Sequence, residues 1–232
     1  MEERYYSKFA VAAVRGRLKR LGKESLLSST LLEKTLDELR EQEREEIFTV
    51  AKANGLDLYH FKRSDRALPR VHKTLGFLKG VYFESLLDVG SGRGVFLLPF
   101  LEEFPYLSVT SVDVLEKRVE LLSDISEGGV SALKVLKANI CEQPLSEKSV
   151  DVVTMLEVLE HIPDVESAIR SAVKIAKKYV VVTVPSKEDD NPEHIHLLTK
   201  PLLTSYFNAC GVDKLSFDGV PGHLFMIAKI DG

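Results

Sequence analysis

A glycine-rich loop is the part of the sequence whose residue types are best suited to binding a ligand. A short apolar run that contains Asp88 is followed by three glycines at alternate positions, Gly90, Gly92 and Gly94. Glycines adopt positive φ angles and let a ligand approach the backbone closely, and a helix that follows them supplies free N–H groups. Val95 stands where a dinucleotide fingerprint has its third glycine, and the Lys-Ser/Thr pair of a P-loop is missing. The loop therefore favours neither a nicotinamide dinucleotide nor a nucleoside triphosphate.

Polar residues also follow the next two apolar runs. Asp113 ends the first of them, 23 residues after Gly90. A carboxylate at the tip of a second strand can accept hydrogen bonds from both hydroxyls of a ribose. Asn139 and Ile140 end the next run and combine an amide with an apolar side chain, which could hydrogen-bond to an adenine ring and pack on it. These positions favour a ligand that contains a nucleoside.

A third group of candidate residues follows a fourth apolar run: Glu157, Glu160 and His161. An imidazole ordinarily titrates near neutral pH, so His161 is a candidate general base, with Glu160 beside it. The alternative for His161 is to cap the turn before Pro163. We expect Glu157 to meet a ligand at the strand end. The same three residues with His196 could also hold a hard divalent cation, although our expectation for this site is no metal.

The elements that position these residues change character along the chain. Up to residue 80 the apolar spacing predicts three helices, over residues 8–21, 28–54 and 69–80, and the net charge is +5. The remaining residues carry −9 and alternate short strands with helices, which predicts βαβ units and a mostly parallel sheet. The expected strands are 85–89, 108–114, 132–139, 150–156, 179–184, 214–217 and 224–230, and the expected helices are 95–103, 115–126, 165–177 and 201–210. The turn-rich residues 218–222 predict a hairpin, and so an antiparallel last strand.

Length and composition limit the number of domains and the class of protein. The 232 residues, with a net charge of −4, suit one domain with an appendage. We see no transmembrane span and no export signal, and therefore expect a cytoplasmic protein that does not contact a membrane. Two isolated cysteines are too few for a disulfide framework or a cysteine-based zinc site.

Over roughly residues 70–230 these motifs resemble the class I S-adenosylmethionine-dependent methyltransferases. The resemblance implies a doubly wound, mostly parallel seven-stranded sheet of the Rossmann-like α/β class, with an N-terminal helical extension over residues 1–68 and the cofactor-binding domain over residues 69–232. It implies S-adenosyl-L-methionine as cofactor, although the family more often has Asp where Asn139 stands. The expected cofactor contacts are Asp88, Gly90, Ser91, Gly92, Gly94, Asp113, Val114, Asn139, Ile140 and Glu157.

The segment after the fourth strand bears on the methyl acceptor. It lacks the Asn/Asp-Pro-Pro-Tyr/Phe sequence of the family's DNA and protein amino-methyltransferases. Its Glu-x-x-Glu-His pattern, Glu157 to His161, is similar to ubiquinone-pathway O-methyltransferases and other small-molecule methyltransferases. We therefore expect a methyltransferase with Glu160 and His161 as catalytic residues and a small hydroxylated acceptor. The polar loop 186–193 is expected to act as a lid.

Two further hypotheses remain open from the sequence. One is an RNA methyltransferase, since the arrangement of Glu157, Glu160, His161 and His196 also resembles the magnesium-dependent small-RNA 2′-O-methyltransferases. Phosphates would then meet residues 61–66 or the cations Arg15, Arg17, Lys19, Arg20 and Lys23. The other is a non-catalytic module that binds the cofactor. The apolar stripe of the predicted helix 28–54 could serve a homodimer.

Overall fold

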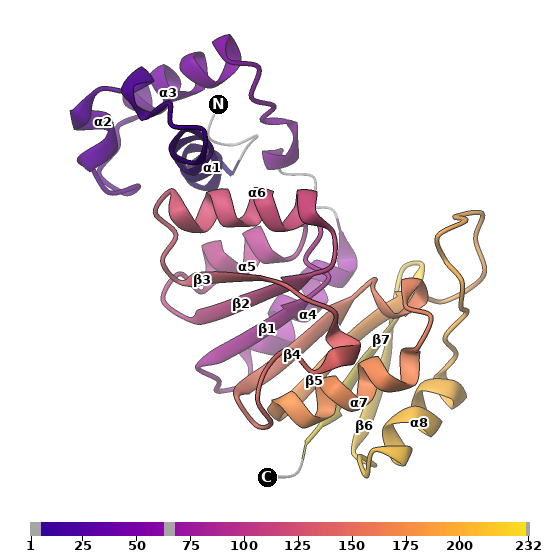
Figure 1. The fold of residues 1–232 in the computed structure, drawn as a ribbon. Coiled ribbons are helices and arrows are strands. Elements are labelled where there is room, and N and C mark those ends of the chain that lie inside the picture. Colours follow the sequence, from indigo (N-terminus) through magenta and orange to yellow (C-terminus); the bar gives the residue numbers. More distant parts are fainter. Residues whose placement is uncertain (1–5, 63–67, 231–232) are drawn as a thin grey trace.

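The computed structural model describes residues 6–62 and 68–230 and consists of a seven-stranded sheet with helices on both faces (Figure 1). The strand order is β3-β2-β1-β4-β5-β7-β6. The strands are β1 (Ser85–Val89), β2 (Ser108–Asp113), β3 (Leu133–Lys137), β4 (Val150–Leu156), β5 (Ala176–Pro185), β6 (Leu215–Val220) and β7 (His223–Lys229). Strands β1 to β5 are parallel, whereas β7 is antiparallel to both of its neighbours. The predicted fold class and the reversed last strand are confirmed.

The sheet reverses its winding direction between β1 and β4. Val89 at the end of β1 pairs with Val112 of β2 on one side and with Met155 of β4 on the other. The loops that follow these three strands therefore meet at one edge of the sheet. In open α/β sheets this is the place where ligands bind.

Apolar side chains on both faces of the central strands create two cores. One face of the sheet, including Leu86 and Val152, packs with α4 (Pro69–Lys79), α5 (Leu97–Glu103) and α6 (Glu116–Glu127). The opposite face, including Leu87 and Val153, packs with α7 (Val165–Ile175) and α8 (Lys200–Ala209). The helix predicted over residues 165–177 ends at Ile175 because β5 begins at the next residue. The described residues also form short 3₁₀ turns: η2 (Glu24–Leu26), η3 (Tyr59–Phe61), η5 (Ile140–Glu142) and η6 (Leu159–His161).

The N-terminal region holds α1 (Ser7–Arg20), α2 (Ser29–Glu33) and α3 (Glu41–Ala53). The single helix predicted over residues 28–54 is wrong, because Lys34 adopts an extended conformation and ends α2. A turn follows, in which the backbone N–H and hydroxyl of Thr35 donate to Glu38. Leu36 and Leu39 of this connection are buried in the core of the same chain. The apolar stripe is thus used in folding this region.

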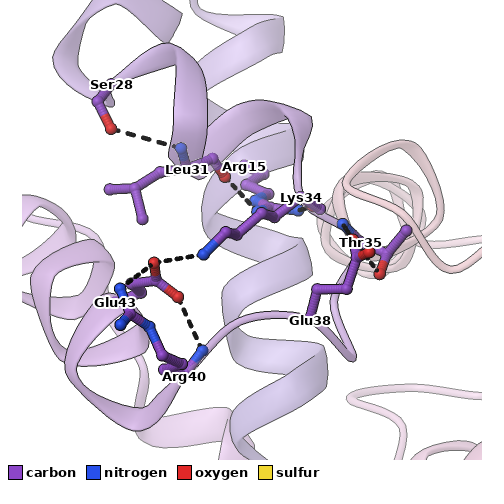
Figure 2. Close-up of polar contacts among 8 residues, drawn as sticks. All are labelled: Arg15, Ser28, Leu31, Lys34, Thr35, Glu38, Arg40 and Glu43. Carbon is purple, nitrogen blue, oxygen red and sulfur yellow. Dashed lines mark hydrogen bonds and ion pairs between the residues drawn. The ribbon is translucent and has the colours of Figure 1, made fainter.

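Polar side chains fix the break between α2 and α3, as Figure 2 shows. Arg15 of α1 donates to the carbonyl oxygens of Leu31 and Lys34, at the end of α2. Glu43 of α3 accepts from the Lys34 ammonium at 2.6 Å and from Arg40. Hydrogen bonds from Arg40 and Lys34 lower the pKa of Glu43 to about 2. Glu43 thus helps to hold together the N-terminal helices α1 to α3, which we call the cap.

The cap is joined to the sheet domain by an unusually close contact between α1 and α6 (Figure 1). A Cβ at Gly16 would lie 1.9 Å from the carbonyl oxygen of Asp124, and one at Gly128 would lie 1.7 Å from that of Ala12. The Arg20 guanidinium adds two hydrogen bonds to the Asp124 carboxylate, at 2.8 and 3.0 Å. The hydrophobic core continues from one side of this contact to the other. The domain boundary at residue 68 remains a prediction.

Within the described residues, none of the helices has the length and apolar content needed to cross a membrane. Cys141 and Cys210 are free and partly exposed.

Candidate active site

The glycine loop leaves the carboxyl end of β1 with three residues at positive φ: Gly90 at 63°, Gly92 at 56° and Gly94 at 82°. A Cβ at Gly90 would lie 2.6 Å from the Val158 side chain, in the loop after β4. Gly90 is therefore required both by its backbone conformation and by the close approach of that loop. Gly90 and Gly92 also line a cavity.

Asp88 is the most buried charged group of this loop, with 2% of its surface exposed. Its Oδ1 accepts from the Thr154 hydroxyl at 2.7 Å, whereas its Oδ2 is buried and has no hydrogen-bond partner among the described residues. Burial raises the pKa of Asp88 to about 6. A cationic ligand group at Oδ2 would supply the missing partner.

A cavity of about 160 Å³ lies at the glycine loop. It is lined by Arg70, Val71, Asp88, Gly90, Ser91, Gly92, Arg93, Val95, Phe96, Leu156 and Glu157. Arg70, in the first turn of α4, was missed by sequence reasoning. It lies 18 residues before Asp88 and belongs to no local motif, so only the fold brings the two together. The cavity thus combines a carboxyl and a guanidinium, which suits a zwitterionic ligand.

Asp113 connects the glycine loop to the start of α6. Its Oδ2 accepts from the Gly92 N–H at 3.1 Å and its Oδ1 accepts from the Leu115 N–H at 2.9 Å. A carboxylate oxygen has two lone pairs, so each retains one for a ligand hydroxyl. Val114, which is 57% exposed, offers an apolar surface beside it.

The other predicted cofactor residues differ in exposure: Ser91 and Ile140 are buried, whereas Asn139 is exposed. The Ser91 hydroxyl donates to the Asp88 carbonyl at 3.2 Å and accepts from the Ser111 hydroxyl at 2.8 Å, which stabilises the loop from within. Asn139 accepts from the Cys141 N–H at 3.0 Å through Oδ1, which leaves its Nδ2 group to donate to a ligand. Ile140 is buried in the core.

Glu157, immediately after β4, has a positive φ of 57° and is held by two side chains. Its Oε1 accepts from the Thr183 hydroxyl at 2.8 Å, and its Oε2 lies 2.8 Å from His223 Nε2. His223 Nδ1 in turn lies 3.0 Å from the Pro221 carbonyl oxygen. Both ring nitrogens of His223 thus face oxygen atoms. Sequence reasoning missed His223, which lies on β7 and reaches Glu157 only through strand pairing.

Glu160 and His161 lie in η6, directly after this pair. Glu160 is 0% exposed, and neither of its carboxyl oxygens has a hydrogen-bond partner among the described residues. Burial raises the pKa of Glu160 to about 8. His161 is exposed, and its Nδ1 lies 2.8 Å from the Glu193 carbonyl oxygen. Nδ1 is therefore the protonated nitrogen, and Nε2 carries the lone pair.

The segment after β5 brings a second imidazole to this place. The Ile195 N–H donates to the Glu160 carbonyl at 2.9 Å, and the ring of His194 stands 4.8 Å from that of His161. Ligand atoms of Glu160, His161 and His194 all lie within 4.8 Å of one another. The set named from sequence, with Glu157 and His196, is not the one that assembles, because Glu157 is paired with His223 and His194 lies closer.

Comparisons with known proteins bear on the kind of domain that carries these residues. A family model described as a methyltransferase domain matches residues 87–182. A ubiquinone biosynthesis O-methyltransferase of Rickettsia akari is 33% identical over 92 residues, which are 40% of this chain and 36% of that protein. A ribosomal RNA small subunit methyltransferase G of Leuconostoc citreum is 43% identical over 51 residues, 21% of either chain. The chain spans about a third of the length of the first relatives it matches.

Solved structures extend the likeness to the whole sheet. The crystal structure of a SAM-dependent methyltransferase from Aquifex aeolicus superimposes with a TM-score of 0.60 at 22% identity, and the match covers 78% of this chain and 98% of that one. At this identity the likeness shows the fold. Residues 87–182 thus match a methyltransferase domain, and the sheet around them has the fold of the S-adenosylmethionine-dependent methyltransferases.

Proposed function

We propose that this protein is an enzyme that transfers a methyl group from S-adenosylmethionine to a hydroxyl of a small acceptor. The observation that carries the proposal is the pair of buried carboxyl groups, Asp88 and Asp113, on either side of the glycine loop at the point where the sheet reverses direction. The names of the relatives support methyl transfer and differ in the acceptor.

The residues present fit the cofactor group by group. Asp88 Oδ2, buried without a partner, would accept from the ammonium of the methionine part, and Arg70 would bind its carboxylate. Asp113 would accept from the ribose hydroxyls, with Val114 and the Asn139 amide next to the adenine. The bound cofactor supplies a methyl group on a positively charged sulfur.

Methyl transfer to a hydroxyl requires that the protein align the acceptor oxygen with the methyl carbon and supply a group that accepts the hydroxyl proton. The acceptor oxygen forms a bond to the methyl carbon, and the electron pair of the broken carbon–sulfur bond stays on sulfur. Because the leaving group is a neutral thioether, positioning can supply much of the rate enhancement. His161 Nε2, whose lone pair is free because Nδ1 donates to Glu193, would take the hydroxyl proton. Glu160 lies beside this ring; its carboxyl is neutral below its pKa of about 8 and would ionise more readily when the ring gains a proton.

The contacts of the N-terminal helices favour a small acceptor over RNA. Arg15 is buried and donates to backbone carbonyls, and Arg17 and Arg20 pair with acidic residues of α6. Three of the cations named as phosphate ligands thus have a structural role. Of the other candidate segment, residues 63–66 lie outside the part of the chain that the structure describes.

The test combines cofactor binding with turnover. Calorimetry is expected to give one S-adenosylmethionine per chain for the native protein and a large loss of affinity for Asp113→Ala. A panel of catechols and other small phenols, with S-adenosylhomocysteine as the measured product, is expected to yield turnover that falls about 10²- to 10⁴-fold in His161→Ala with cofactor affinity unchanged. Binding without turnover on any acceptor would favour the non-catalytic module, and no binding would refute the proposal.

A further inference from the structure

We propose that Glu160, His161 and His194 form a binding site for one divalent transition-metal ion of the zinc type. The three side chains come from η6 and from the segment after β5, and one ligand atom from each lies within 4.8 Å of the others. Glu160 and His161 are also the residues proposed above to act in proton removal, so the metal site is tested by metal binding and the methyltransferase proposal by cofactor binding.

The two imidazoles are oriented as metal-binding imidazoles are. His161 donates through Nδ1 to the Glu193 carbonyl, and His194 Nδ1 lies 3.0 Å from the Asp189 carboxylate. In both rings Nε2 is left as the nitrogen with a lone pair. A ring whose second nitrogen is fixed by a carbonyl or a carboxylate is the usual outer arrangement of a metal site.

Glu160 supplies an independent observation. Its carboxyl group is entirely buried, and both oxygens lack a hydrogen-bond partner among the described residues. A buried polar group without a partner is costly, and a buried carboxyl of this kind is stabilised by a cation. The unpartnered carboxyl lies next to the two prepared imidazoles, so a cation at this place would satisfy all three.

The ligand types select the metal. Two nitrogens and one carboxylate suit Zn²⁺, Co²⁺ or Fe²⁺, whereas Mg²⁺ prefers oxygen ligands only. Ligand atoms around zinc lie about 3.3 Å apart when the bonds are about 2.0 Å. The ligand atoms, now within 4.8 Å of one another, would have to move closer to bind zinc, and His161 and His194 are not fully buried. Three protein ligands leave a fourth position, as in catalytic zinc sites.

An ion here would replace His161 as the group that promotes loss of the acceptor proton. His161 Nε2 would be a ligand and no longer a base, and an acceptor hydroxyl in the fourth position would release its proton to solvent because the metal lowers its pKa. This last step rests on the proposed function. The ion would also fasten the segment after β5 to η6, beyond the hydrogen bond from Ile195 to Glu160.

The experiment is a titration of the full chain, freed of metal by a chelator, with Co²⁺ followed by visible absorption and with Zn²⁺ and Mg²⁺ followed by calorimetry. The expected result is one Co²⁺ per chain with the intense absorption of a four-coordinate site, competition by Zn²⁺, and no heat from Mg²⁺. Affinity is expected to fall at least about 100-fold in His194→Ala and Glu160→Gln, and about 10-fold in Asp189→Asn.

The control is His72→Ala, an exposed histidine on α4, which should leave the titration unchanged. Glu160→Gln alters a buried group and could prevent folding. If the Glu160→Gln protein does not fold, the metal affinity of His194→Ala, in the segment after β5, decides whether the site exists. Absence of Co²⁺ binding, or binding that His194→Ala leaves intact, would overturn the site. Cofactor affinity measured on the same preparations shows separately whether the methyltransferase proposal stands.

Discussion

Glu157 and His223 form an ion pair at 2.8 Å that links the end of β4 to the start of β7, across β5. The pair holds Glu157 in a left-handed conformation, at a cost that its contacts must offset. It also separates Glu157 from Glu160, so the two carboxyl groups have different surroundings.

Replacing His223 by Ala is expected to destabilise the protein by about 1–3 kcal/mol, because a largely buried carboxylate loses its charged donor. Urea unfolding would measure the change, with His72→Ala as the control. His223→Gln, which can still donate, should recover part of the loss. An unchanged urea midpoint in His223→Ala would show that the pair contributes nothing.

The affinity for S-adenosylmethionine is expected to rise with pH up to about 6 and then level off. Burial raises the pKa of Asp88 to about 6, so the carboxyl is neutral below that pH, whereas a cationic ligand requires the carboxylate. A proton therefore competes with the ligand, and affinity should fall about tenfold per pH unit below the pKa. Calorimetry at several pH values would measure this. Asp88→Asn should bind more weakly at neutral pH and lose the dependence; the same slope in the variant would assign it to another group.

Arg70→Ala is expected to weaken S-adenosylmethionine binding about tenfold or more through the loss of a charged contact to the methionine carboxylate. The decarboxylated analogue isolates this contact, since it lacks the group that Arg70 would bind. Its affinity should be the same for the native protein and the variant. Equal losses for both ligands would place Arg70 in a structural role. His72→Ala on the same helix is the control.

Gly16→Ala is expected to cost about 3 kcal/mol or more, because the new methyl group would overlap the Asp124 carbonyl and force α1 away from α6. Gly76→Ala in α4 is the matched control: a Cβ there meets nothing within 4 Å, so the change should be neutral or stabilise by up to about 1 kcal/mol. Thermal unfolding of the two variants would compare them. Equal midpoints would mean that the backbone contact between α1 and α6 is loose.

The parts of the site that the sequence predicted are those set by local chain geometry. The glycine loop and Asp113 follow directly from apolar strands, and parallel strands deliver their ends to one edge of a sheet. The pairing of Glu157 with His223, 66 residues later, depends on the register of β7 and leaves no local signal. Which of His194 and His196 lies beside Glu160 likewise depends on an irregular segment, which the hydrogen bond from the Ile195 N–H holds in place.

Contacts between residues distant in the sequence also explain why the single helix predicted over residues 28–54 is wrong. Leu36 and Leu39 continue a helical apolar spacing, but they are buried from the turn and connection between α2 and α3. The carbonyls that end α2 are taken by Arg15, a residue of α1. Periodicity alone does not distinguish a long helix from two short ones whose ends are satisfied from elsewhere in the chain.

The contact between α1 and α6 also orders events during synthesis. Gly16 leaves the ribosome more than a hundred residues before its partner Asp124. Until α6 has been made, the apolar residues of α1, including Val11, Val14 and Leu18, have no sheet domain to pack against. The packing of the cap at the beginning of the chain is thus completed late, and the face of α1 that meets α6 stays uncovered while the residues between them are made.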